Sequence, residues 1–240
     1  PGALADGVYP VVVERELNGG VIASSTLTFE VLGVSVASMT PVAGPIGMPF
    51  TIYGGNFGNY SAGYTKVLIG GTTTPLTLWS DTKIQGTIPG SLAAGDYDLV
   101  VERALNGGVV RSLASTFTVT VPMLETINPS TAAVIAPFTI TGASFGNYVA
   151  NSTKVLINGA TTALTLWTDT KIQGKLPFLL NGTYPVLIQR SLNGGLAESS
   201  TAYITVAEPV ISSMTPLSGA VGTVFNLYGS SFGPYDASQT

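Results

Sequence analysis

Apolar and polar residues alternate along much of the 240-residue chain. Tyr97, Leu99 and Val101 occupy every second position of one run, and Phe117 and Val119 do the same in another. A period of two places successive side chains on opposite faces of a strand, and the runs are rich in the Thr, Val and Ile that strands favour. No segment shows a sustained period of 3.6 residues. The pattern therefore predicts short β-strands and no helical core.

Turn residues separate these runs every ~8–12 residues, the spacing typical of an all-β sandwich. The clearest turn signal is Asn-Gly-Gly, at residues 18–20, 106–108 and 193–195. Asn and Gly supply the positive φ angles of a tight hairpin. About seven antiparallel strands in ~88 residues predict an immunoglobulin-like sandwich. The expected core of the first complete unit is Phe50, Ile52, Tyr97, Leu99, Val101, Phe117 and Val119.

The chain contains internal sequence repeats. The motif Phe-Thr-Ile that begins at Phe50 recurs at Phe138 and, as Phe-Asn-Leu, at Phe225, so the offsets are 88 (138 − 50) and 87 (225 − 138). Residues 66–88 and 154–176 agree at 17 of 23 positions. Such similarity indicates a recent duplication, in which shared residues are weak signals of function. The predicted division is a partial repeat at 1–34, complete repeats at 35–121 and 122–207, and a partial repeat at 208–240.

The two partial repeats are each expected to hold strands that cannot bury their apolar face alone, because a sandwich needs both sheets. Two explanations stay open: the protein continues in both directions, or strands of neighbouring molecules complete one another as in strand addition. Continuation is favoured, because a domain joined from the two pieces lacks the counterparts of residues 66–78 and 83–88.

Two sets of residues stand out in the repeat: Thr40-Pro41, Gly44, Gly47 and Phe50–Gly58, then Asp81–Ile84, Ile88-Pro89 and Gly95–Val101. The first set resembles the opening of an IPT/TIG repeat, and the second resembles its middle and end. The resemblance covers essentially the whole chain and implies an immunoglobulin-like sandwich, in agreement with the periodicity. It also implies a kinship with tandem arrays on bacterial surfaces, although the family includes receptor ectodomains, accessory domains of polysaccharide-acting enzymes and dimerisation domains of transcription factors. The fold does not choose among these roles.

The amino-acid composition excludes several classes of partner and of catalytic group. Charged residues make up 9% of the chain, against roughly 25% in an average soluble domain, and the net charge is −4 with nine basic residues spread singly. A nucleic-acid partner is not expected, because it requires a basic patch. Without His or Cys there is no imidazole base, thiol nucleophile or thiolate metal site. Asp96 and Asp98 have no acidic counterparts in the other copies, so a repeated calcium site is not expected.

The sequence therefore predicts no enzyme, no catalytic residues, no cofactor and no metal. No apolar run reaches the ~18 residues of a membrane span, so no span is expected in this segment.

Two kinds of residue are candidates for contact with a ligand or another chain. Trp79 and Trp167 each lie in Leu-Trp-x-Asp-Thr-Lys-Ile-Gln-Gly, where alternation turns Leu76 and Leu78 inward and leaves the Trp outward or at a strand end. Such a ring either stacks on a sugar or covers the rim of the sandwich. The second kind is apolar and outward-facing at equivalent positions of the repeats: Val100 and Leu187, and Leu68 and Leu156. Rows of this kind are typical of contacts between chains or of glycan-covered surfaces.

The leading hypothesis is a structural segment of an extracellular or cell-surface stalk, sheath or filament, whose partners are other copies of itself or adjoining repeats. An adhesin or carbohydrate-binding array that uses the Trp face, with glycans as partners, is the alternative. An accessory region of a larger enzyme is a third hypothesis.

Overall fold

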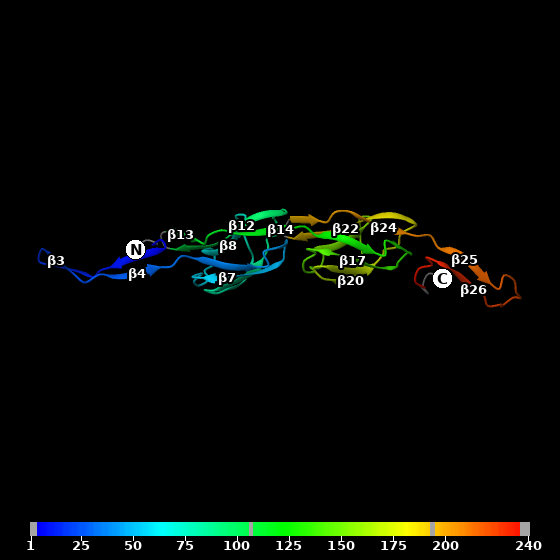
Figure 1. Cartoon of the computed structure of the whole chain (residues 1–240), viewed down its shortest axis with the longest axis horizontal. Helices are drawn as coiled ribbons and strands as arrows, with labels where there is room; N and C mark the ends of the chain where they lie inside the picture. Colours follow the sequence, from blue (N-terminus) through cyan, green and yellow to red (C-terminus); the bar gives the residue numbers. More distant parts are fainter. Residues whose placement is uncertain (1–3, 106–107, 193–194, 236–240) are drawn as a thin grey trace. The chain divides into compact units, whose positions relative to one another are not determined.

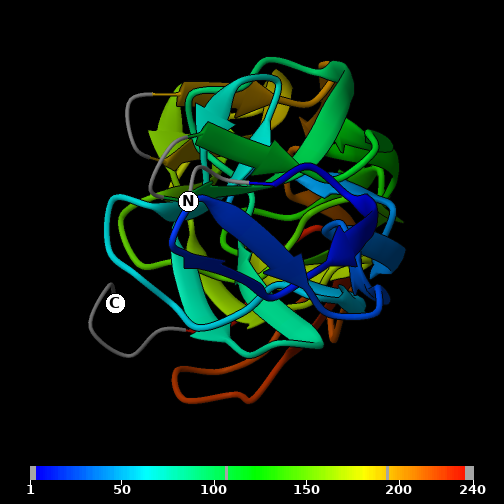
Figure 2. The same ribbon diagram turned by 90° about the vertical axis from the view of Figure 1, so that its left-hand side faces the viewer.

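The computed structural model describes residues 4–105, 108–192 and 195–235. Within those ranges all regular structure is strand and none is helical (Figures 1 and 2). Consequently no helix among the described residues could cross a membrane. The chain divides into two compact units, with the main boundary between Thr118 and Val119. The described strands form two complete two-sheet sandwiches, with further strand pairs before the first and after the second in the sequence, so the predicted all-β fold of tandem immunoglobulin-like sandwiches, two complete and two partial, is confirmed.

The first complete sandwich consists of two sheets. One sheet has four strands, in the spatial order β10 (Leu76–Trp79), β11 (Lys83–Thr87), β7 (Pro49–Gly55) and β5 (Ser35–Thr40). The other follows the order β6 (Ala43–Pro45), β14 (Ser115–Thr120), β12 (Gly95–Leu105), β8 (Thr65–Ile69) and β9 (Thr72–Thr73), and β13 (Gly108–Arg111) also pairs with β12.

The second complete sandwich repeats this topology strand for strand. Its first sheet has the order β15 (Met123–Asn128), β17 (Pro137–Ala143), β21 (Lys171–Lys175) and β20 (Ala163–Trp167). Its second sheet has the order β16 (Thr131–Ala132), β24 (Ala202–Val206), β22 (Gly182–Leu192), β18 (Thr153–Ile157) and β19 (Ala160–Thr161), with β23 (Gly195–Glu198) paired to β22.

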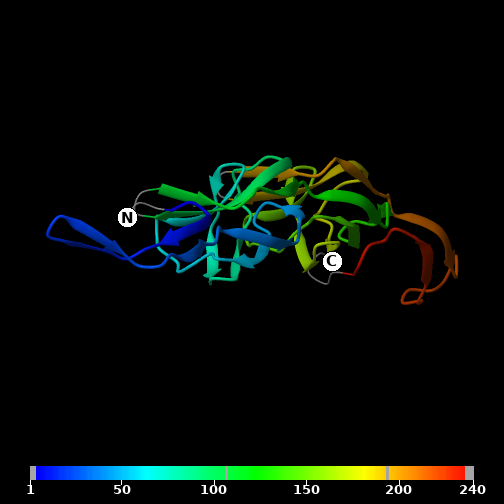
Figure 3. The ribbon, with the colours of Figure 1, turned by 60° about the vertical axis from the view of Figure 1, so that its left-hand side comes forward.

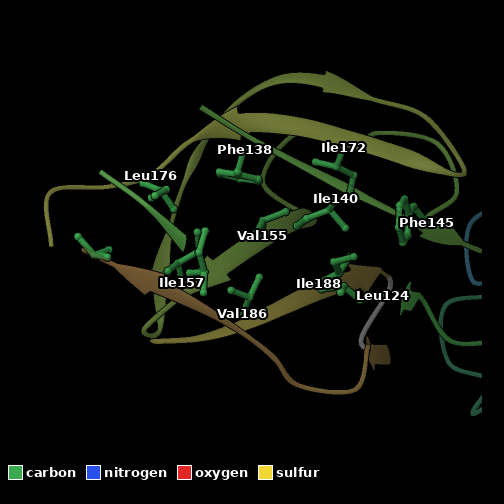
Figure 4. Packing of buried hydrophobic residues seen from close by; sticks show 13 residues of the cluster. Leu124, Phe138, Ile140, Phe145, Val155, Ile157, Ile172, Leu176, Val186 and Ile188 are labelled. Atoms are coloured by element: carbon green, nitrogen blue, oxygen red, sulfur yellow. The ribbon is translucent and has the colours of Figure 1, made fainter. Parts of the chain in front are cut away.

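The core forms where the alternating residues of the two sheets face each other. In β8 and β18 the pattern of buried and half-buried side chains alternates strictly, as the period of two predicts. Figure 4 shows the second core, in which Phe138, Ile140 and Ile172 of one sheet face Val155 and Val186 of the other. Six of the seven core residues predicted for the first repeat are at most 2% exposed: Phe50, Ile52, Leu99, Val101, Phe117 and Val119.

The seventh predicted core residue, Tyr97, is only half-buried. Its ring lies against the backbone of Gly70, where an added Cβ would come within 2.4 Å of the ring. Gly70 has a φ of 55° and follows β8, so the ring covers a turn at the end of the sandwich rather than filling its centre.

The predicted inward direction of Leu78 is wrong. The pairing of β10 with β11 shifts register between Leu76 and Leu78, which is a β-bulge. The extra residue reverses the alternation, so Leu78 is 40% exposed while Leu76 is half-buried. The equivalent bulge lies between Leu164 and Leu166 of the second repeat, and Leu166 is 36% exposed.

The partial repeats contain strand pairs without a second sheet among the described residues. In the N-terminal piece β1 (Gly7–Val11) pairs with β4 (Leu27–Val31), and β2 (Glu14–Leu17) pairs with β3 (Gly20–Ala23) in the dark-blue hairpin of Figure 3. In the C-terminal piece β25 (Val210–Thr215) pairs with β26 (Asn226–Ser230). Nearly all their side chains are exposed, as two-stranded elements imply.

The Asn-Gly-Gly turn prediction is confirmed where the structure describes it. Asn18 and Gly19, with φ angles of 41° and 86°, form the two-residue connection between β2 and β3. The equivalent pairs at 106–107 and 193–194 lie outside the described residues.

Candidate functional site

A clamp of three side chains closes around Gly58 in the loop that follows β7. Its backbone N–H donates to the Asp81 carboxylate (2.8 Å), and its carbonyl accepts from the Trp79 indole N–H (2.9 Å). The Arg103 guanidinium lies against its Cα and donates from Nη1 to the carbonyl of Asn56 at 3.0 Å. Gly58 has a φ of 67°, and an added Cβ would lie 2.4 Å from an Arg103 nitrogen. Both the backbone angle and the arginine therefore require glycine here.

The second repeat builds the same clamp around Gly146. Asp169 accepts from the Gly146 N–H (2.8 Å), and Trp167 donates to the Gly146 carbonyl (2.8 Å). Arg190 is fully buried and donates to the carbonyls of Phe145 and Asn147. Burial lowers the pKa of Arg190 to about 10, and the charge of Asp169 opposes that shift. Both bonds come from Nη1, which carries two N–H donors, so one guanidinium nitrogen serves two backbone acceptors.

The clamp explains where the sequence-predicted tryptophans lie. Trp79 and Trp167 stand at the ends of β10 and β20 and are half-buried, in agreement with the strand-end interpretation. Each ring packs edge-on against a buried phenylalanine, Phe57 or Phe145, with ring centroids 6.2 and 6.3 Å apart. The indole N–H is already used by the glycine carbonyl. The tryptophans therefore help to hold the loop in place, and only their remaining faces are open to a ligand.

The exposed aromatic ring beside each tryptophan is a tyrosine. Tyr60 and Tyr148 are 56% and 55% exposed, and their centroids lie 6.2 and 6.0 Å from Trp79 and Trp167. The sequence reasoning missed these tyrosines. A signal was available: Phe-Gly-Asn-Tyr occurs in both complete repeats, and Tyr235 occupies the same place after Phe232-Gly233 in the third copy.

A groove runs beside this aromatic pair, where the chain crosses from one sheet to the other. In the second repeat it is lined by aromatic, hydroxyl, amide and amino groups and by the edge strand β20: Tyr148, Asn151, Thr153, Lys154, Thr161–Thr165, Leu166 and Trp167. The first repeat has the equivalent groove, lined by Tyr60, Gly63, Thr65, Lys66, Thr73, Thr74 and Leu76. We call these the second and first aromatic grooves.

The predicted outward apolar residues form cross-strand pairs. Leu68 of β8 is opposite Val100 of β12, and Leu156 of β18 is opposite Leu187 of β22. All four are half-buried. Their neighbours along each strand point into the core, so the pairs lie on the outer faces of the equivalent sheets. Their predicted role in contacts with a ligand or another chain stays a prediction.

An ion cluster lies on the outer face of the first repeat, next to the Leu68–Val100 pair. Glu102 is 4% exposed and accepts from Lys66 (2.8 Å) and from Arg111 (2.7 Å). The hydrogen bond from Lys66 lowers the pKa of Glu102 most; burial opposes it, and Arg111 lowers it further. In the second repeat Gln189 replaces Glu102, and its side-chain amide donates to Glu198 at 2.8 Å. The two outer faces therefore carry different charges.

The other polar candidate pair, Asp96 and Asp98, lies at the start of β12. Asp96 accepts a hydrogen bond from the Thr118 hydroxyl at 2.6 Å. Among the described residues, no group of three or more acidic side chains is placed to hold a metal ion.

The architecture defines a protein of tandem immunoglobulin-like sandwiches, and the sequence assigns the family. The model of the IPT/TIG domain matches residues 35–119 and 122–204, and the chain belongs to this family. No curated protein matches the chain.

Solved structures are similar at low identity. The plexin A4 extracellular region is 14% identical with a TM-score of 0.47 over 73% of this chain and 18% of its own. The protein SGBP-B of the Bacteroides ovatus mixed-linkage glucan utilization locus, in complex with a mixed-linkage heptasaccharide, is 19% identical with a TM-score of 0.32 over 87% of this chain and 55% of its own. The chain thus spans less than a fifth of the plexin and about half of the glucan-utilization protein.

Proposed function

We propose that the chain is a structural, non-enzymatic segment of an extracellular or cell-surface repeat array, such as a stalk, sheath or filament. The observation that carries this proposal is the duplicated clamp. In both repeats the Trp, Asp and Arg side chains, which could have served chemistry or binding, are used to fix one loop to the sandwich. Loops held in this way are expected in a rigid domain with a structural role.

The low charge of the chain supports a role in assembly. Soluble designs carry roughly 25–35% charged residues on the surface, whereas this whole chain carries 9%. Little repulsion therefore opposes contact between the outer faces that carry the Leu68–Val100 and Leu156–Leu187 pairs. The proposed partners are other copies of the chain or adjoining repeats.

Immunogold labelling of intact source cells tests the array proposal. Antibodies raised against the purified chain are expected to label extended structures on the cell exterior. Labelling that requires permeabilised cells would contradict the extracellular role.

The contact role of the apolar pairs has its own test. Leu156→Ser with Leu187→Ser is expected to weaken self-association in sedimentation velocity. Leu196→Ser is the matched control, because Leu196 is 61% exposed on the neighbouring hairpin strand β23. Equal self-association in the double variant, the control and the parent would argue against these pairs as a contact.

The non-enzymatic part of the proposal rests on chemistry. The chain has no His and no Cys, and its one buried carboxylate, Glu102, among the described residues is neutralised by two basic groups. Turnover of any substrate by the purified chain, abolished by a single Asp or Glu substitution, would refute it.

A further inference from the structure

The two aromatic grooves share equivalent lining residues but differ in the pairing of their lysine. Each is bordered by an exposed tyrosine, several threonines and one lysine, at equivalent positions of the two repeats. In the first groove Lys66 is bound to Glu102 at 2.8 Å. In the second, Gln189 stands opposite Lys154, and the Lys154 amino group forms no ion pair among the residues that the structure describes. No acidic residue lines the second groove. Duplication has therefore produced one groove whose lysine is paired and one whose lysine forms no ion pair with any described residue.

We infer that the second aromatic groove binds an acidic oligosaccharide, through a carboxylate or sulfate group held by Lys154. The carbon–hydrogen face of a pyranose ring suits the exposed Tyr148 ring and the open face of Trp167, because aromatic side chains offer a flat apolar surface next to a polar tip. The side chains of Asn151, Thr161 and Thr165 supply donors and acceptors for sugar hydroxyls. This binding role goes beyond the array role and does not depend on it.

Charge decides between a neutral and an acidic sugar. Lys154 is half-buried, and its ammonium group has no ion-pair partner in the part of the chain that the structure describes. It therefore gains from an anionic ligand, since a charge-assisted hydrogen bond is roughly twice as strong as a neutral one. Nucleic acid would also supply anions and stacking rings, but the chain carries a net charge of −4 and its nine basic residues do not cluster. An acidic sugar with one or a few charges fits a single lysine.

The test is a titration of the isotope-labelled chain followed by nuclear magnetic resonance. The ligands are tetragalacturonate for the carboxylate, a heparin-derived tetrasaccharide for the sulfate, cellotetraose as the neutral sugar and hexathymidylate as the nucleic acid. We expect saturable shifts around Tyr148, Lys154 and Trp167 with at least one of the two acidic sugars, weakened by added salt. Whichever of the two acidic sugars binds more tightly identifies the acidic group as a carboxylate or a sulfate.

The variants are chosen to leave the clamp intact. Lys154→Gln is expected to weaken binding about tenfold, the factor that corresponds to a modest charge-assisted hydrogen bond. Tyr148→Ala should also weaken it, whereas the matched Tyr60→Ala in the first repeat should not. The Trp167 indole N–H resonance is the folding control, because that group is bonded to Gly146 within the clamp.

Four results would overturn the inference. These are no saturable shift with either acidic sugar, equal affinity for cellotetraose, unchanged affinity in Lys154→Gln while the Trp167 resonance is retained, and binding by hexathymidylate alone. None of these results affects the immunogold labelling, so the array proposal is tested independently of the groove proposal.

Discussion

Replacing Gly58 with alanine should destabilise the first repeat by two separable effects. The first is backbone strain, because Gly58 has a φ of 67°, and an L-residue in the left-handed region costs roughly 1–2 kcal/mol. The second is steric. The new Cβ would lie 2.4 to 2.9 Å from three atoms of the Arg103 guanidinium, which must move and give up its bond to Asn56. A hydrogen bond from a charged group contributes about 1.5–3 kcal/mol. The total loss is therefore about 2.5–5 kcal/mol.

A matched control separates the two effects. Gly63 lies in the same loop with a φ of 80°, and nothing lies within 4 Å of an added Cβ. Gly63→Ala should therefore show the strain alone, about 1–2 kcal/mol. In an Arg103→Ala background the steric part disappears, so Gly58→Ala should then cost no more than the control.

Urea unfolding followed by tryptophan fluorescence measures these differences. Each complete repeat has one tryptophan, so a Trp167→Phe background leaves Trp79 as the reporter of the first repeat. Midpoints are compared only where the slope m is unchanged. If Gly58→Ala and Gly63→Ala differ by less than about 0.5 kcal/mol, the arginine is not held against the glycine and the clamp has been misjudged.

Three further predictions concern the core, the ion cluster and the buried arginine. Phe117 is 0% exposed, so Phe117→Ala should cost roughly 3–5 kcal/mol in urea unfolding, whereas Leu113→Ala, at a 90% exposed position, should stay within about 0.5 kcal/mol of the parent. The pKa of Glu102 is lowered in the folded state from 4.5, so the stabilisation from this carboxylate is present above that pH and is lost as the pH falls through the lower folded value. In Glu102→Gln the unfolding temperature should therefore fall less steeply with decreasing pH than in the parent. The control Glu125→Gln, at an exposed position, should keep the parent's dependence on pH. Arg190→Lys keeps the charge but removes the planar guanidinium whose Nη1 donates to two carbonyls, so it should lower the unfolding midpoint reported by the second repeat's tryptophan. An unchanged midpoint would count against the role of the guanidinium.

The strand pattern was predictable because burial on one face imposes a period of two on the sequence. That single constraint identified six of the seven predicted core residues of the first repeat. It failed at Leu78, because a β-bulge changes the period by one residue, and nothing in the run Leu-Thr-Leu-Trp distinguishes a bulged strand from a regular one. It failed at Tyr97 because a ring that covers a turn alternates in the same way as a ring in the core.

The candidate site was predictable only in part. The sequence marked Trp79 and Trp167 and left two interpretations open, and the contacts that hold the two rings in place join residues far apart in the chain. Arg103 reaches Asn56 across 47 positions, and Trp79 reaches Gly58 across 21. A periodicity argument contains no information about such distant pairs. Tyr60 and Tyr148 lie in loops between strands, where the period of two carries no signal for them.

Comparison of the two copies separates what the fold needs from what it leaves free. Both copies keep every member of the clamp, and the structure gives each member a contact that the loop requires. Their shared identity is therefore explained by folding and says little about binding. The outer faces differ instead: Glu102 and Arg111 become Gln189 and Glu198, which leaves Lys154 without the partner that Lys66 has. A change of this kind does not disturb the core. Differences between the copies in what they bind are therefore to be sought at the outer sheet face and the groove beside it.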